Sequence, residues 1–214
     1  MKAIFLDLDG TLIDSPAAIY QIYTAFLAKY GFEGSREEFE ELNGPNLSQI
    51  VAHLKEKYGI NEEKESLKKR YASGFLQVYG KVPLFEGVRE FLEMTRQEKL
   101  QLALVSSAPR EALKTFLFEH DLSSYFTKSI SGDDVEESKP NPEIYLRALK
   151  ELSLNADEVI AVEDSLNGVK AAIAANIETL CFAKQERVKN VPFYTHWQQI
   201  QQIVQERLKT SSLK

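Results

Sequence analysis

Apolar residues along the chain follow two patterns, short unbroken runs and stripes spaced by three or four residues. The runs predict buried parallel strands at 2–6, 102–105, 129–131, 159–162 and 179–182. The stripes between and after the later runs predict amphipathic helices, because residues three and four apart share one helix face. Strands that alternate with helices in this way predict right-handed crossovers and a parallel α/β sheet.

A long helical region interrupts this alternation directly after the first predicted strand. Apolar stripes that each close at a glycine predict helices there and no strand. We therefore expect a core made of residues 1–15 and 83–214 and a helical insert of residues 16–82. The two connections, near Asp14 and Val82, are the natural hinges, so the insert is placed to act as a lid.

Composition and charge narrow the class of protein. The 214 residues are 43% hydrophobic and 27% charged, which is typical of a globular chain. The net charge is −6 and no dense basic block is present, so we expect no nucleic-acid partner. The single cysteine, Cys181, excludes an intramolecular disulfide, and no apolar run reaches the length of a membrane span. We expect a cytoplasmic protein without a membrane partner, present as a monomer or a weak homodimer.

Candidate chemistry begins where the first strand ends. Asp7 and Asp9 leave the apolar run together, and Gly10 follows at once. Two neighbouring carboxylates are costly to desolvate unless a cation or a shared proton offsets their repulsion, so this pair predicts a metal. Asp7 can attack an electrophile such as phosphorus, while Asp9 can hold and return a proton. A surface turn in which both carboxylates only cap the backbone is the alternative.

Three further groups of polar residues also follow predicted strands, at the sheet edge where ligands gather. Ser106 and Ser107 stand just before a helix, where hydroxyls and backbone amides can cradle a phosphate. Lys139, framed by prolines, can meet a phosphoryl oxygen. Glu163 or Asp164 can complete an oxygen-rich shell for a small cation such as Mg²⁺. Helix capping and a solvated lysine are the alternative explanations of these groups.

Four motifs therefore occur in a fixed order, with the helical insert after the first of them. They are Asp7-Leu8-Asp9-Gly10-Thr11, Ser106, Lys139-Pro140 and Glu163-Asp164-Ser165. Together they resemble the haloacid dehalogenase superfamily of aspartate-nucleophile phosphatases, and the resemblance covers nearly the whole chain. Segments 131–142 and 163–172 are similar to the subgroup that contains β-phosphoglucomutase and small sugar-phosphate phosphatases.

This resemblance implies a Rossmann-like parallel sheet core with an inserted helical cap of the C1 type. It also implies a Mg²⁺-dependent phosphatase for a small phosphorylated substrate, such as a sugar phosphate or a phosphoglycolate-like compound. Asp7 would be the nucleophile that forms a phospho-aspartyl intermediate, and Asp9 the general acid and then base. The phosphate binders would be Ser106, Ser107 and Lys139, and the metal would be held by Asp7, Asp9 and Asp164, with Asp9 using its backbone carbonyl.

One departure from the family bears on the reaction. Mutases and many relatives carry a histidine five residues past the position of Asp14, where this chain has Ile19. A phosphomutase of the β-phosphoglucomutase type therefore stays the weaker enzyme alternative, and a non-catalytic phospho-ligand binding protein is the alternative from another class. Segment 43–46 takes the place of the family's specificity loop, so we expect it near the substrate. Tyr20, which lies off the main stripe of its helix, is our candidate for an aromatic wall of the substrate chamber.

Overall fold

The computed structural model describes residues 1–42, 44–186 and 188–211. Within these residues the strands form one six-stranded parallel sheet with the order β3-β2-β1-β4-β5-β6. The strands are β1 Ala3–Leu6, β2 Gln101–Ser106, β3 Lys128–Ser131, β4 Val159–Glu163, β5 Glu178–Phe182 and β6 Phe193–Tyr194. The five predicted strands are confirmed. The sixth, β6, was not predicted, because two residues are too short to show a pattern.

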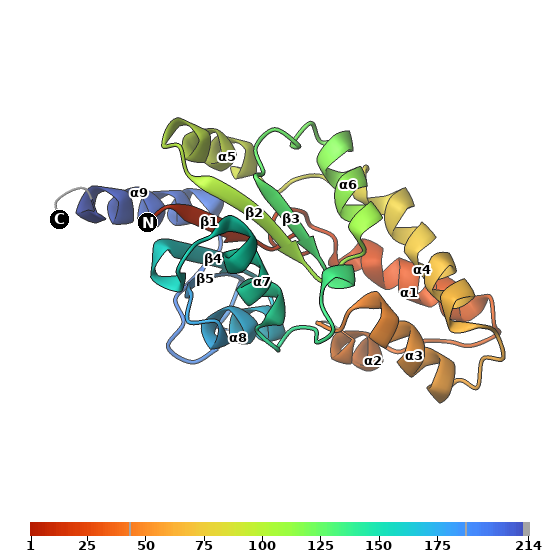
Figure 1. The fold of residues 1–214 in the computed structure, drawn as a ribbon. Helices are drawn as coiled ribbons and strands as arrows, with labels where there is room; N and C mark the ends of the chain where they lie inside the picture. The colour runs from red at the N-terminus through yellow and green to blue at the C-terminus, as the bar shows by residue number, and fades with distance from the viewer. Residues whose placement is uncertain (43, 187, 212–214) are drawn as a thin grey trace.

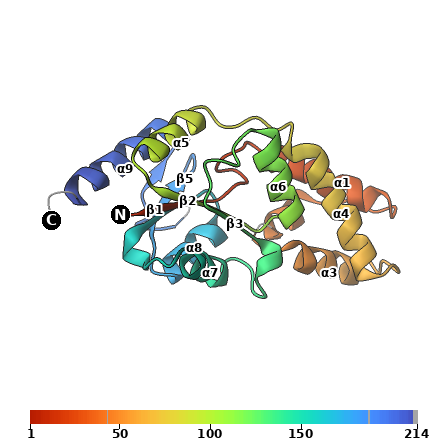
Figure 2. The ribbon, with the colours of Figure 1, turned by 45° about the horizontal axis from the view of Figure 1, so that its top comes forward.

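Helices cover both faces of this sheet, which confirms the Rossmann-like α/β fold. Figure 2 shows α5 and α9 on one side of the strands and α7 and α8 on the other. The helices are α1 Pro16–Ala28, α2 Arg36–Glu41, α3 Leu47–Lys57, α4 Lys64–Tyr79, α5 Val88–Gln97, α6 Arg110–Glu119, α7 Glu143–Leu152, α8 Leu166–Ala174 and α9 Trp197–Ser211. Across the described ranges, no helix combines the length and the apolar character that crossing a membrane requires.

The central strand β1 explains why its sequence is an unbroken apolar run. Ala3 and Phe5 pack into the cluster that includes α7 and α8, whereas Ile4 and Leu6 pack into the cluster on the opposite face. All four side chains are fully buried. Because β1 pairs with β2 on one side and β4 on the other, the chain connections diverge at its carboxyl end. Ligand sites of open α/β sheets form at such a point.

Helices α1 to α4 gather beyond this carboxyl edge of the sheet (Figure 1). The sequence patterns predicted three helices here and did not reveal α2, because Phe39 is the only apolar residue of its six. The signal for α2 was a capping pair, since the hydroxyl of Ser35 accepts a hydrogen bond from the backbone N–H of Glu38. The limits of the insert, 16–82, stay a prediction.

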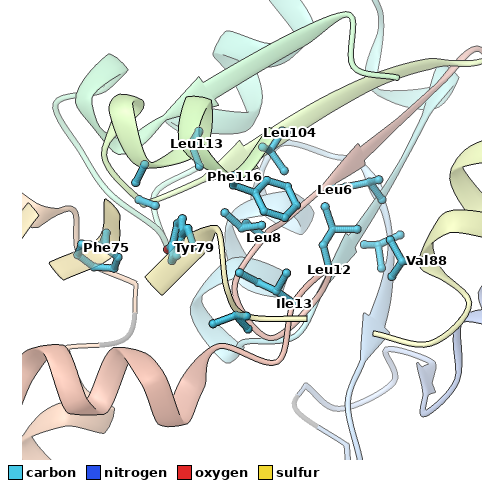
Figure 3. Packing of buried hydrophobic residues seen from close by; sticks show 14 of the residues in the cluster. Leu6, Leu8, Leu12, Ile13, Phe75, Tyr79, Val88, Leu104, Leu113 and Phe116 are labelled. Carbon is cyan, nitrogen blue, oxygen red and sulfur yellow. The ribbon is translucent and has the colours of Figure 1, made fainter. Parts of the chain in front are cut away.

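One apolar cluster continues from the sheet into the insert. Leu8, Leu12 and Ile13, in the loop after β1, are fully buried. Figure 3 shows them between the sheet and two residues of α4, Phe75 and Tyr79. The loop that carries the predicted nucleophile therefore shares its hydrophobic packing with the last helix of the insert.

Candidate active site

Asp7 and Lys139 are far apart in the sequence and in direct contact in the structure. The backbone N–H of Asp7 donates to the carbonyl of Val162 at 3.1 Å, which extends the parallel pairing of β1 by one residue. The Lys139 amine lies 2.8 Å from Asp7 Oδ1 and also donates to the carbonyl oxygen of Val105 at 3.0 Å. Only 4% of Lys139 and 6% of Asp7 is exposed, so this ion pair is buried.

Glu163 holds the Lys139 amine from the other side. Its Oε1 accepts from Lys139 at 2.6 Å and from the Tyr145 hydroxyl at 2.5 Å. Burial, and then the charge of Asp7, raise the pKa of Glu163. Burial alone would lower the pKa of Lys139, but the charges of Asp7 and Glu163 outweigh it and raise that pKa above its usual value. The lysine therefore stays protonated between two carboxylates.

Three carboxylates at this edge could hold a metal ion. Ligand oxygens of Asp7, Glu163 and Asp164 all lie within 4.8 Å of one another. Burial and the charge of Asp7 raise the pKa of Asp164 well above its usual value. Gly10 (φ +76°) leaves room for the carboxylate, because a Cβ there would lie 2.2 Å from Asp164 Oδ2. These hard oxygen donors fit a small divalent cation such as Mg²⁺.

Asp9 lies outside that set of carboxylates and has different partners. The Ser15 hydroxyl donates to its Oδ1 at 2.6 Å, and the Tyr79 hydroxyl donates to its Oδ2 at 2.5 Å. Burial raises the pKa of Asp9 to about 6, against the effect of these two hydrogen bonds. A carboxyl group with this pKa can exchange a proton near neutral pH. Its backbone carbonyl as a metal ligand stays a prediction.

Ser15 and Tyr79 were not predicted, and they stand at the two connections of the insert. Ser15 occupies the N-cap of α1 without making a side-chain capping bond, so its hydroxyl is available to Asp9. Tyr79 is the last residue of α4 and is fully buried. A serine before a proline and a tyrosine before a glycine were the only local signals, and neither points to a distant carboxylate.

Ser106 and Ser107 reach the same edge but already have protein partners. The buried Ser106 hydroxyl accepts from the backbone N–H of Ala108 at 3.1 Å, which is a local turn contact and not a helix cap, because the N-cap of α6 is Pro109. The Ser107 hydroxyl donates to the carbonyl of Gly44 at 2.9 Å. Phosphate binding by either serine stays a prediction.

The segment expected near the substrate contacts the core directly. Asn43 lies outside the described residues. A Cβ on Gly44 (φ +125°) would lie 3.0 Å from the carbonyl oxygen of Lys139, and the backbone N–H of Asn46 donates to the Ser138 hydroxyl at 2.7 Å. The insert is therefore closed onto the loops that carry Ser107 and Lys139.

Comparison with known proteins identifies the family. Residues 4–182 match the haloacid dehalogenase-like hydrolases. The chain belongs to this family. A phosphorylated carbohydrates phosphatase of Thermotoga maritima is 35% identical over 183 residues, which cover 84% of each chain. The 6-phosphogluconate phosphatase of Escherichia coli K12 is 25% identical over 97% of this chain and 96% of its own. A β-phosphoglucomutase from Clostridium difficile, 20% identical, shares the fold over both whole chains with a TM-score of 0.86.

A cavity of about 120 Å³ separates the insert of this hydrolase from the sheet edge, and we call it the chamber. Its core side includes Asp9, Ser107 and Asp164, and its insert side chains are mainly apolar: Ile19, Phe39, Leu42, Leu47, Ile50 and Phe75. Tyr20 is not among the lining residues, so that expectation was wrong. Its ring packs against Tyr23 and Phe39 instead.

Proposed function

We propose that this hydrolase is a Mg²⁺-dependent phosphatase that releases phosphate from a small phosphorylated metabolite through a phospho-aspartyl intermediate. One observation carries the proposal: the Lys139 amine lies 2.8 Å from Asp7 Oδ1, beside the buried Glu163 and the half-buried Asp164. A nucleophile, a fixed cation and a metal-ligating group thus meet at the ligand-binding edge of the sheet. The phosphatase relatives in sequence support the same reaction.

In the first step, a carboxylate oxygen of Asp7 attacks phosphorus and the bond from phosphorus to the alcohol oxygen breaks. Asp9, in its protonated form, gives its proton to the departing oxygen. Lys139, with Ser106 and Ser107, binds the phosphoryl oxygens, where its positive charge stabilises the charge that develops in the transition state. Ser107 must exchange its bond to the insert for one to the substrate.

In the second step, the Asp9 carboxylate takes a proton from water, and that water oxygen attacks phosphorus. The bond to Asp7 breaks, inorganic phosphate leaves and Asp9 is again protonated. The hydrogen bonds from Ser15 and Tyr79 fix the carboxylate in place for both transfers. The closed insert keeps bulk water from the acyl phosphate.

Asp7, Asp164 and the backbone carbonyl of Asp9 would hold Mg²⁺. When bound, the ion supplies positive charge that neutralises the transferring phosphoryl group. We assign Glu163 a positioning role, because its Oε1 is already bound to Lys139 and Tyr145.

Phosphate release from 4-nitrophenyl phosphate and a panel of sugar and short-acid phosphates, with and without Mg²⁺, tests this proposal. We expect Mg²⁺-dependent release, with Asp7→Asn lowering kcat/KM by at least about 10³-fold, as for loss of other catalytic nucleophiles. Asp157→Asn, at an exposed aspartate, is the control and should keep full activity.

Two other outcomes would decide for the alternatives. Conversion of a sugar phosphate to its isomer without free phosphate would identify a mutase. Tight binding of phosphorylated compounds by folded, Mg²⁺-loaded protein without any turnover would identify a binding protein. A cytoplasmic location and a monomer or weak homodimer stay predictions.

A further inference from the structure

Resting on the proposed phosphatase function, we propose that the substrate is a phosphate monoester of a small, uncharged and largely apolar alcohol or phenol. The leaving group of a phosphate held at Asp7 must occupy the chamber, since Asp9, its proton donor, lines that cavity. The chamber wall therefore selects the leaving group.

Among the residues that the structure describes, six side chains on the insert side of the chamber neither donate nor accept hydrogen bonds. Ile19, Phe39, Leu42, Leu47, Ile50 and Phe75 all face this cavity. A sugar or polyol in contact with these six side chains would leave water and find no partner among them for its hydroxyl groups, and each buried unpaired hydroxyl weakens binding. An alkyl or aryl group gains from the same contact, because its apolar surface is removed from water.

The chamber also lacks a cation for a second anionic group. Of the described residues that line it, none is lysine, arginine or histidine. Nearby basic residues of the insert are engaged elsewhere, since Lys68 pairs with Asp133 at 2.9 Å and Arg70 pairs with Glu62 at 2.9 Å. Bisphosphates and phosphorylated sugar acids are therefore poor substrates.

The volume of the chamber suits a small leaving group. At about 120 Å³ the chamber is comparable to an apolar cavity of about 150 Å³ that takes up benzene. The bond between Ser107 and Gly44, together with the bond between Asn46 and Ser138, keeps the insert closed at this size. A group the size of one six-membered ring fits.

Two matched pairs of substrates test the proposal. Phenyl phosphate and 4-carboxyphenyl phosphate differ in one charge, and n-pentyl phosphate and xylitol 5-phosphate differ in hydroxyl groups on the same five carbons. We expect kcat/KM to favour the first member of each pair by at least about tenfold, because the second buries unpaired polar groups. 4-Carboxyphenyl phosphate is intrinsically the more reactive ester, because its phenol is the better leaving group. A preference for phenyl phosphate would therefore run against intrinsic reactivity.

A variant pair then locates the selection in the chamber. Ile19→Lys supplies the missing cation, so it should raise kcat/KM for 4-carboxyphenyl phosphate relative to phenyl phosphate by at least about tenfold. Leu76→Lys, at an exposed leucine of α4 outside the chamber, should leave that ratio unchanged.

The outcomes separate the two proposals. Phosphate release that requires Asp7 but favours the charged or hydroxylated member of each pair overturns the substrate class alone. An unchanged ratio in Ile19→Lys, with the variant folded, also overturns it. Absence of release from all four compounds, with Asp7-dependent release from a sugar or short-acid phosphate of the panel, overturns the substrate class alone. Absence of release from every compound tested overturns the phosphatase function together with the substrate class.

Discussion

Replacing Glu38 by glutamine is expected to weaken the wall of the chamber from within the insert. Glu38 is only 4% exposed and lies in α2 beside Phe39, which lines the chamber. It accepts hydrogen bonds from the hydroxyls of Tyr23 on α1 and of Tyr58 at the end of α3, and the Lys57 amine lies 2.8 Å from its Oε1. One carboxylate therefore joins three helices of the insert.

The free energy of this arrangement follows from the pKa of Glu38. Burial acts to raise the pKa, but the hydrogen bonds from Lys57, Tyr23 and Tyr58 outweigh it and lower the pKa from 4.5 to about 2. At about 1.4 kcal/mol for each pKa unit, the ionised carboxylate stabilises the fold by at most about 3 kcal/mol. Lys57 is half exposed, so solvent screening reduces this to about 1–2 kcal/mol.

The sign of the pH dependence follows from the direction of this shift. Because the folded pKa is below the unfolded one, the stabilisation is complete above about pH 4.5 and is lost as the pH falls through about 2. Glutamine cannot ionise and lacks this contribution at every pH. The difference in unfolding free energy between wild type and Glu38→Gln should therefore be largest at neutral pH and fall below half of that value near pH 3.

Urea unfolding of wild type and Glu38→Gln at pH 7 and pH 3 measures both values. Glu40→Gln, at an exposed position of the same helix, is the control and should resemble wild type. An equal difference at the two pH values would refute the assigned role of the charge. Equal stability of the two variants at pH 7 would refute the role of the buried site.

Three further perturbations follow from the active site. Tyr79→Phe removes one hydrogen bond to the Asp9 carboxylate, so kcat should fall by about tenfold or more. Tyr71→Phe changes another buried tyrosine of the same helix and should leave kcat unchanged. Equal kcat values in the two variants would contradict this prediction. Lys139→Met leaves Asp7 and Glu163 without their shared cation, so the unfolding free energy at pH 7 should fall by about 3–5 kcal/mol. Urea titration measures this change, and an unchanged midpoint of the unfolding transition would contradict the prediction. Gly10→Ala places a Cβ 2.2 Å from Asp164 Oδ2, so calorimetric titration should show weaker Mg²⁺ binding. Gly31→Ala is the control, because it has the same left-handed backbone strain but its Cβ would have no atom within 4 Å. This variant should bind Mg²⁺ as wild type does.

The strands of the sheet could be predicted from the sequence because they are buried on both faces. A strand such as β1 must be apolar at every position, so its run of residues and its end at Asp7 were both visible. Because parallel strands end at one edge, the position of each residue after a predicted strand also predicted that Asp7, Lys139 and Asp164 would approach one another. The structure brings these three residues together.

Contacts across the insert could not be predicted, because they depend on tertiary packing rather than on the local sequence pattern. Ser15 and Tyr79 bond to Asp9 from opposite ends of the insert, and no periodicity links them. The prediction of which α1 residue lines the chamber was wrong for the same reason. Ile19 belongs to the apolar stripe and lines the chamber, whereas Tyr20, off the stripe, packs between aromatic neighbours.

The apolar cluster shared by the loop after β1 and helix α4 limits how freely the insert could be exchanged between relatives. Two chain connections look like convenient crossover points for recombination. A transplanted insert, however, would bring its own residues in place of Phe75 and Tyr79. These would pack against a surface of Leu8, Leu12 and Ile13 that fits the present insert. Cavities or overlaps at such a junction destabilise by several kcal/mol. The loop after β1 and the insert should therefore be inherited, and engineered, as a single unit.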